Sequence, residues 1–335
     1  MKKLRLNWGE NYSLKNPTIV KKISKALGYS LAKINLYPDE QYNKTIQLLA
    51  AYHKIKPNQL LLGNGIEGLI HIIARSYVNK DTKVAILSPS FPVYEKTVKI
   101  YGGKPINIPT KINKILNTIA VFDNIENTQL FFLAFPNNPT GHYALSIRQI
   151  NYLLLKYKGL LVVDECYFGI GKLTVLDLLK KHNNLIVLRS FSKSQGLAGI
   201  RFGYALANQH VINNLKKYSY HIEVDSINIF THMIVAAIVK DFKILIKQYL
   251  YFKSQFVNLL SESVNNIQII PSFTTFILVK INKNSQQVYS LLTKKNIFIK
   301  NTLCFNNFPK NIIMFGVPKK EDWRYFIKYL KQALE

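Results

Sequence analysis

Residues 160–167 read LLVVDECY and residues 185–193 read LIVLRSFSK, and these two stretches decide the fold. Each begins with four uncharged apolar residues and ends in polar ones. Short apolar runs of this kind, set between helical patterns, are typical of parallel strands that helices cover on both faces. The two stretches therefore predict strands over residues 160–164 and 185–188 of a mostly parallel sheet in an α/β fold.

The alternation of strand and helix extends outward from these stretches in both directions. Asn16-Pro17 predicts a helix start in an N-terminal arm. Further strands are expected over residues 84–87, 130–134, 275–279 and 312–315. Helices are expected over residues 41–54, 65–78, 146–157, 174–182, 286–295 and 321–334. Another helix is expected to begin at about residue 93, and a long helical stretch with one break is expected over residues 229–263. The pattern predicts a three-layer sandwich over residues 31–228, and a smaller α/β domain from residues 1–30 and 229–335.

The charge of the chain does not by itself indicate a nucleic-acid partner. The 335 residues have a net charge of +27, with 48% hydrophobic and 19% charged residues. Only six of the 45 basic residues are Arg, and the lysines are scattered instead of forming one stripe. We therefore expect a globular protein that binds a small molecule, and no nucleic-acid partner.

The rest of the composition suggests where the protein works. The N-terminus lacks the apolar run of a secretory signal, and no stretch is long enough to span a membrane, so we expect no membrane partner. Cys166 and Cys304 are the only cysteines, which predicts no disulfide framework and favours the cytoplasm. No metal-ligand spacing occurs, so we expect no metal and interpret Cys166 as structural.

Three polar segments are expected at the carboxyl ends of strands, where open parallel sheets bind ligands. They are residues 137–141 (NNPTG), 164–167 (DECY) and 190–193 (SFSK). A partly desolvated Lys193 would be a nucleophile. A buried Asp164 needs a cationic partner, and Arg201, beyond the small residues 196–199, suits a phosphate.

The order of these motifs resembles the fold-type I pyridoxal-phosphate enzymes, and most closely the histidinol-phosphate aminotransferase branch. Residues 36–39 (LYPD) resemble that branch's arm motif, residues 62–67 (LGNGIE) its phosphate loop, and residues 89–94 (PSFPVY) its aromatic segment. The Asn-Pro-Thr-Gly, Asp-x-x-Tyr and Ser-Phe-Ser-Lys motifs follow in family order. The resemblance extends over nearly the whole chain and implies the aminotransferase fold with pyridoxal 5'-phosphate as cofactor.

The resemblance implies a role for each matching residue. Lys193 would bind the cofactor as a Schiff base and move protons. Asp164 would pair with the pyridine nitrogen, and Tyr167 and Asn138 would bind the phenolic oxygen. The ring would stack on Tyr94. The phosphate would be bound by Gly65, Ile66, Ser190, Ser192 and Arg201. In a homodimer, Tyr37 would reach the phosphate of the neighbouring subunit.

Taken singly, several of these motifs have ordinary structural interpretations. Tyr94 is also consistent with a core aromatic residue, and Tyr37 with a surface tyrosine. Asp164 is consistent with a helix cap, and residues 138–141 with a simple turn. The functional interpretation rests on their joint order.

The chain departs from the family pattern at the substrate end. The Arg that usually binds the substrate's α-carboxylate is replaced by Ile312, and the usual Asn of the preceding strand by Thr275. The arm reads Gly9-Glu10-Asn11 where Asn-Glu-Asn is usual. Candidates to replace this Arg are Arg5, Lys300, Asn301 and Lys310.

These departures leave two enzyme functions open. The first is an aminotransferase that acts on a small amine or carbonyl compound, phosphorylated ones included. The alternative is a decarboxylase of a phosphorylated amino acid, like the threonine-phosphate decarboxylases. A binding protein without catalysis is disfavoured by the presence of Lys193, Asp164 and Arg201.

Overall fold

The computed structural model describes residues 2–219 and 227–335. Its largest element is a seven-stranded sheet with the strand order β2-β8-β7-β6-β5-β3-β4. The strands are β2 (Leu60–Gly63), β3 (Lys83–Ser88), β4 (Lys104–Pro109), β5 (Leu130–Ala134), β6 (Leu160–Asp164), β7 (Leu185–Ser190) and β8 (Gly203–Ala207). Strands β3 to β7 pair in parallel, and β8 runs antiparallel to both β7 and β2. The sheet is therefore mostly parallel, as the apolar runs predict.

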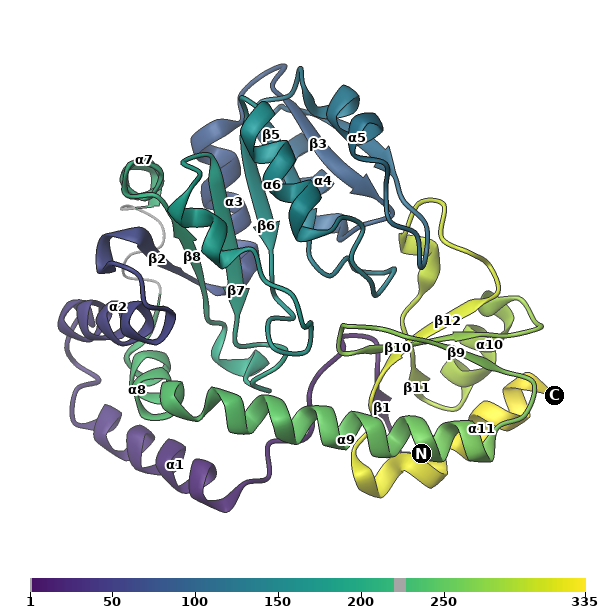
Figure 1. Cartoon of the computed structure of the whole chain (residues 1–335). Coiled ribbons are helices and arrows are strands. Elements are labelled where there is room, and N and C mark those ends of the chain that lie inside the picture. Colours follow the sequence, from purple (N-terminus) through teal and green to yellow (C-terminus); the bar gives the residue numbers. More distant parts are fainter. Residues whose placement is uncertain (1, 220–226) are drawn as a thin grey trace.

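Helices cover both faces of this sheet (Figure 1). One face is packed by α3 (Gly65–Tyr77), α4 (Pro92–Ile100) and α7 (Gln209–Ser219). The other face is packed by α1 (Pro17–Leu31), α2 (Asp39–His53), α5 (Thr118–Ile125), α6 (Ile147–Lys156) and α8 (Ile229–Ile238). Two separate apolar cores result, one on each side, which confirms the predicted three-layer sandwich.

The smaller part of the molecule is built on a three-stranded antiparallel sheet in the order β12-β10-β9. Its strands are β9 (Gln268–Ile270), β10 (Phe276–Lys280) and β12 (Ile312–Gly316), and α10 (Ser285–Lys294) and α11 (Trp323–Leu334) pack on it. Strand β1 (Leu4–Arg5) of the N-terminal arm pairs in parallel with β11 (Ile297–Phe298). The arm is thereby attached to the smaller part.

The helix α9 (Phe242–Ser263) joins the two parts and runs along both of them (Figure 1). Phe242 belongs to the core of the large sheet, and Phe256 to the core of the smaller part. The expected break in residues 229–263 lies at the short 3-10 helix Val239–Asp241. Among the described residues, no helix is both long and apolar enough to cross a membrane.

The prediction of a helix over residues 174–182 is wrong. Only the five residues Leu176–Lys180 are helical there, and they form a 3-10 helix. Its start is held by side chains instead of by an α-helical turn. Thr174 Oγ1 donates to Glu165 Oε2 at 2.9 Å, and the Val175 backbone N–H donates to Glu165 Oε1 at 2.7 Å. Strands β2, β4 and β8 and helices α5 and α7 were not predicted from the sequence.

Candidate active site

A cavity of about 540 Å³ lies at the carboxyl ends of the central strands. Asp164 ends β6 and Ser190 ends β7, and these strands pair in register next to β5. Nine residues predicted from the sequence line this one cavity: Ile66, Tyr94, Asn138, Asp164, Tyr167, Ser190, Ser192, Lys193 and Arg201. The strand ends thus bring together segments that are far apart in the chain, as expected for a parallel sheet.

One end of the cavity has the geometry of an anion site. Helix α3 begins at Gly65, whose positive φ of +72° favours glycine. A side chain at this position would bring its Cβ within 2.9 Å of Arg201 Nη2, so glycine lets the guanidinium approach the helix start. Ser190 Oγ accepts a hydrogen bond from the Ser192 backbone N–H at 3.0 Å. A helix N-terminus, a guanidinium and two hydroxyls together suit a phosphate.

A buried carboxylate lies deeper in the same cavity. Asp164 is 2% exposed, and desolvation raises its pKa. Its Oδ2 accepts from the Tyr94 hydroxyl at 2.6 Å, and its Oδ1 from the Cys166 backbone N–H at 2.9 Å. Within the described parts of the chain, no Lys or Arg forms an ion pair with it. A cationic group of a ligand would compensate this buried charge.

Two aromatic residues lie at this part of the cavity, Tyr94 on α4 and Phe91 at its N-cap. Tyr94 has no exposed surface, and its ring stacks on Phe132 with centroids 5.1 Å apart. Phe91 lines the cavity, is only partly buried and contacts Tyr94 edge to face. Tyr94 therefore supports Asp164 through its hydroxyl, and Phe91 is the more accessible aromatic ring.

Lys193 connects the sheet side of the cavity to the N-terminal arm. Its Nζ donates to the Trp8 carbonyl at 2.7 Å and lies 5.8 Å from the Phe276 ring centroid. Asn11 Nδ2 donates to the carbonyls of Lys193 and Ser194, both at 3.1 Å. Desolvation lowers the pKa of Lys193. The amine is thus positioned and is more readily neutral than a solvated lysine.

The turn at residues 137–141 presents one amide to the cavity and uses the other for support. Asn137 is fully buried, accepts from Ser90 Oγ at 2.8 Å and donates to the Pro89 carbonyl at 2.9 Å. Asn138 lines the cavity, and its buried Oδ1 has no hydrogen-bond partner among the described residues. Buried amides are rarely left unpaired, so Asn138 is available to a ligand.

The arm and the smaller part form the opposite wall, for which the sequence indicated Arg5 and Lys300 but not Asn7 or Trp8. That wall contains Arg5, Asn7, Trp8, Glu10, Phe276 and Lys300. Arg5 and Lys300, two of the candidates for binding the substrate's carboxylate, lie in this wall, whereas Asn301 and Lys310 do not. Cys166, interpreted as structural, also lines the cavity.

The departures at the substrate end have structural explanations. Gly9 has φ +61°, and a Cβ there would lie 2.7 Å from Thr275 Oγ1, so these two departures are in contact. Ile312 is 4% exposed and packs with Phe305 and Met314 in an apolar cluster. The position of the missing Arg is thus filled by apolar side chains.

Tyr37 lies apart from this cavity. Its side chain is 82% exposed and takes no part in the cavity wall. No group of three His, Cys, Asp or Glu side chains within residues 2–219 and 227–335 could bind a metal ion.

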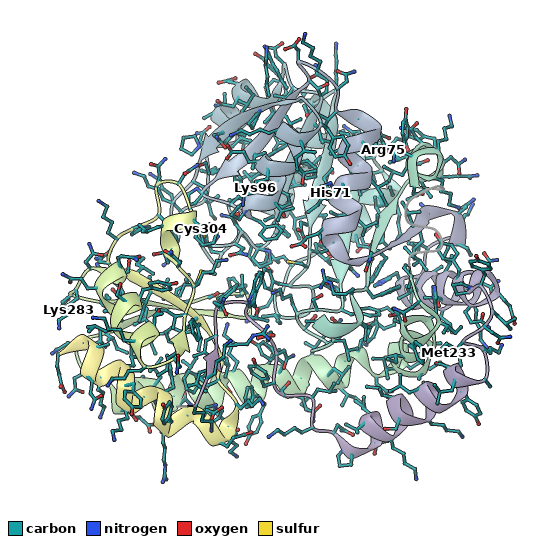
Figure 2. All side chains as sticks on the ribbon, turned by 180° about the vertical axis from the view of Figure 1, so that it is seen from behind. His71, Arg75, Lys96, Met233, Lys283 and Cys304 are labelled. Carbon is teal, nitrogen blue, oxygen red and sulfur yellow. The ribbon has the colours of Figure 1, made fainter. Side chains whose placement is uncertain are left out.

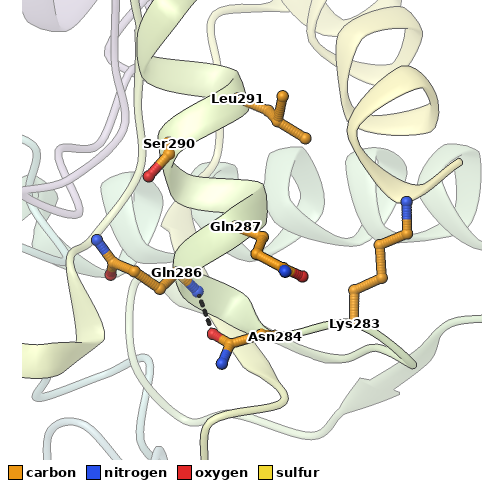
Figure 3. A pocket seen from close by; sticks show the side chains of 6 residues that line it. All are labelled: Lys283, Asn284, Gln286, Gln287, Ser290 and Leu291. Carbon is orange, nitrogen blue, oxygen red and sulfur yellow. Dashed lines mark hydrogen bonds between the residues drawn. The ribbon is translucent and has the colours of Figure 1, made fainter.

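The other hollows of the molecule lack comparable chemistry. A hollow of about 230 Å³ lies where Lys96 of α4 faces the segment around Cys304 (Figure 2). Another lies along α10, where Lys283 and neutral polar side chains line an open surface (Figure 3). Neither contains a buried charge without a partner, in contrast to the cavity at Asp164.

Comparison with known proteins agrees with this geometry. Residues 1–328 match the family model described as aminotransferase class I and II. The chain is 33% identical over 290 residues to a histidinol-phosphate aminotransferase of Thermoanaerobacter pseudethanolicus. The alignment covers 84% of this chain and 79% of that relative. It is 30% identical over 316 residues to a protein described as a threonine-phosphate decarboxylase of Caldanaerobacter subterraneus subsp. tengcongensis. This alignment covers 90% of this chain and 84% of that relative.

A solved structure has the same fold. The histidinol-phosphate aminotransferase of Sinorhizobium meliloti, in complex with pyridoxal-5'-phosphate, aligns with a TM-score of 0.85 and 23% identity. The alignment covers 99% of this chain and 90% of that one. The similarity extends over both parts of the molecule.

Proposed function

This chain belongs to the aminotransferase class I and II family, and on that premise we propose that it is a pyridoxal-phosphate-dependent aminotransferase of the histidinol-phosphate aminotransferase type. Its substrates would be a small amine and the corresponding carbonyl compound, phosphorylated ones included. The observation that supports this most is the single cavity that gathers Lys193, Asp164, Asn138 and Arg201 from four separate segments.

The residues of the cavity fit this cofactor. The helix start at Gly65, together with Arg201, forms a cradle that a side chain at residue 65 would fill, which suits the phosphate. Asp164 offers a buried negative charge to a protonated ring nitrogen. Asn138 Oδ1, which is buried without a hydrogen-bond partner among the described residues, leaves this amide available to the ligand.

When bound, the cofactor supplies a carbonyl carbon that accepts an amine and a ring that withdraws electrons from it. Lys193 Nζ would hold the cofactor and, when a substrate amine replaces it there, would move a proton at the substrate carbon, a role that its pKa, lowered by desolvation, favours. Asp164 would pair with the ring nitrogen in its protonated form, and the Tyr94 hydroxyl donates to Asp164 and holds it in place. Phe91, with Tyr94 behind it, offers its ring to the face of the cofactor.

We also propose that the enzyme is a homodimer in the cytoplasm. The end of α1 and the segment after it expose a group of large apolar side chains: Leu27, Tyr29, Leu31, Ile34, Leu36 and Tyr37. An exposed apolar group of this size supports an interface with a second copy, in which Tyr37 would reach the partner's phosphate site. The two free cysteines are compatible with a reducing compartment.

The cofactor assignment is tested by trapping. Borohydride reduction of the purified enzyme, followed by peptide mapping, should place the pyridoxyl group on Lys193. A label on another lysine would refute the assignment. Lys253, partly buried and hydrogen-bonded to the carbonyls of Ser272 and Thr274, is an internal control that should stay unlabelled.

The relative described as a threonine-phosphate decarboxylase makes decarboxylation the second candidate. The purified holoenzyme is mixed with glutamate, with histidinol phosphate and with threonine phosphate. Formation of 2-oxoglutarate from glutamate, at up to one equivalent per bound cofactor, which takes up the amino group, indicates transamination. Release of carbon dioxide from threonine phosphate without a keto acid product indicates decarboxylation and would overturn the first proposal.

A further inference from the structure

The described residues place four cationic side chains in the wall of the cavity, and three of them have oxygen partners. Arg5 Nη2 lies 3.1 Å from Glu10 Oε1, and Lys193 Nζ lies 2.7 Å from the Trp8 carbonyl. Arg201 Nη1 lies 3.3 Å from the Ala198 carbonyl, and its Nη2 lies 3.9 Å from a glutamate carboxylate. These partners leave the fourth cation, Lys300, as the exception.

Lys300 has no hydrogen bond or ion pair through Nζ with any described residue. Instead, Nζ lies 5.8 Å from the Trp8 ring centroid and 5.5 Å from the Phe305 ring centroid. The Lys300 backbone is held by its N–H, which donates to the Met314 carbonyl at 2.9 Å. An ammonium next to two aromatic rings, with no acidic partner in the described part of the chain, is available to an anionic ligand.

The tertiary structure places the Lys300 ammonium in the same cavity as Lys193, with Trp8 in contact with both. Strand β1 pairs with β11, which ends two residues before Lys300, so the arm residue Trp8 lies beside Lys300. The Trp8 carbonyl in turn accepts from Lys193 Nζ. Lys300 is also close enough to Lys193 to lower the pKa of Lys193, although desolvation is the larger cause. Trp8 thus contacts both lysines.

We propose that Lys300, between the rings of Trp8 and Phe305, binds the anionic group of the substrate. The ligand class is a carboxylate or a phosphate monoester on the same molecule as the reacting amine. Ile312 cannot serve, because its side chain is buried among apolar residues. This inference rests on the proposed function for its choice of ligand, but the binding itself depends only on Lys300 and its surroundings.

The test measures binding of two anions that cannot be transaminated, glutarate and glycerol phosphate. Calorimetry on the holoenzyme compares the wild type with Lys300→Met, Lys300→Arg and Lys295→Met. Lys295 is a matched control, since its Nζ also lies over a tyrosine ring, at 5.9 Å, in the same part of the molecule but outside the cavity. Lys300→Met should weaken binding of at least one anion about tenfold or more, as expected for loss of a charge-assisted hydrogen bond.

The pattern of losses identifies the anion. Loss of glutarate binding alone assigns a carboxylate site, loss of glycerol phosphate binding alone assigns a phosphate site, and loss of both assigns a shared site. Lys300→Arg should restore most of the affinity, and Lys295→Met should bind like the wild type. Lys300→Met with unchanged affinity for both anions, or a wild type that binds neither, overturns the proposal.

A separate measurement distinguishes this failure from that of the proposed function. Uptake of pyridoxal phosphate is followed by the absorbance of the bound cofactor in every variant, and Lys300→Met should load like the wild type. A chain that takes up no cofactor would refute the proposed function. Anion binding is then measured on the same protein without cofactor and still decides the role of Lys300.

Discussion

Asp164 and Tyr94 illustrate how single residues set the chemistry of the site. The carboxylate is almost completely buried, and desolvation raises its pKa. The Tyr94 hydroxyl, 2.6 Å away, opposes that shift because it stabilises the ionised form. One hydroxyl behind the carboxylate thus helps to keep it charged for a cationic ligand.

Removing this hydroxyl should weaken the site. Tyr94→Phe is expected to lower cofactor affinity about tenfold, because a hydrogen bond to a charged group contributes about 1.5–3 kcal/mol. Absorbance titration with pyridoxal phosphate measures the effect. The matched control is Tyr157→Phe, which removes a buried hydroxyl bonded to Thr128 at 2.9 Å, far from the cavity. If both variants bind the cofactor equally well, Tyr94 does not support Asp164.

The apolar surroundings of Ile312 lead to a second prediction at this scale. Ile312→Arg places a cation among apolar side chains and should lower the free energy of unfolding by about 3–5 kcal/mol. Ile312→Val should cost only about 1 kcal/mol. Urea unfolding compares the two. An Arg variant as stable as the Val variant, with improved use of glutamate, would mean that this position does reach the substrate.

At the scale of elements, a buried ion pair joins the ends of β6 and β7. Arg189 Nη2 lies 2.8 Å from Glu165 Oε2, and both side chains are 1% exposed. The guanidinium lies 3.5 Å from the Phe168 ring centroid and 3.0 Å from His53 Nδ1 of α2. Glu165 directly follows Asp164, and Arg189 directly precedes Ser190, so this pair positions both cavity segments.

The contact with Arg189 also determines the charge of His53. Because the guanidinium donates to Nδ1, the imidazole is neutral and its Nε2–H donates to the Tyr204 hydroxyl at 2.8 Å. Desolvation, with the charge of Arg189, lowers the pKa of His53 to about 3. Desolvation lowers the pKa of His232, on α8, to about 4.

These two histidines predict a loss of stability in mild acid. Above pH of about 6.5 both are neutral in the folded and unfolded states. Below that pH only the unfolded chain gains the protons, so each histidine lowers the free energy of unfolding by about 1.4 kcal/mol per pH unit until its folded pKa is reached. Urea unfolding between pH 7 and pH 5 measures the slope.

A variant separates the contribution of one histidine. His232→Gln should reduce that slope by about 1.4 kcal/mol per pH unit, because the contribution of this imidazole is gone. His210→Gln, a change on the exposed side of α7, should leave the slope as it is. A slope that is the same in all three proteins would contradict the assignment of His232.

For the whole molecule, the N-terminal arm is the element that completes the active site. The arm begins with β1, which pairs with β11 of the smaller part, and then passes between the large sheet and the smaller part to reach α1 (Figure 1). Trp8 and Asn11 contact the Lys193 segment on the way. The other end of α1 presents the exposed apolar group that includes Ile34 and Leu36. One N-terminal segment therefore serves both the cavity and the proposed interface.

The interface leads to a prediction about assembly. Ile34→Lys together with Leu36→Lys should shift the protein from dimer to monomer in sedimentation velocity and weaken cofactor binding, because Tyr37 then has no partner site. Leu155→Lys is the control, since Leu155 is 68% exposed on α6, outside this group. A wild type that sediments as a monomer and binds the cofactor tightly would contradict the dimer.

The sequence alone determined the central architecture and the cofactor end of the cavity. Strands β5 and β6 begin and end where the apolar runs predict, and the helix start at Asn16-Pro17 is confirmed by the Asn16 cap, which accepts from the Thr18 and Ile19 backbone N–H groups. Local patterns suffice there because buried strands and helix caps depend on neighbouring residues. The boundary placed at residue 228 stays a prediction, although Ile234 and Val235 of α8 pack in the core of the large sheet.

Only the tertiary structure decided the substrate end. The contacts of Lys193 with Trp8 and of Trp8 with Lys300 join residues that are more than 180 positions apart. The position of Tyr94 behind Asp164 and the antiparallel edge strands β2 and β8 likewise depend on pairing between distant segments. Such contacts leave no periodic pattern in the sequence, because each partner is selected by the shape of the folded chain and not by its neighbours.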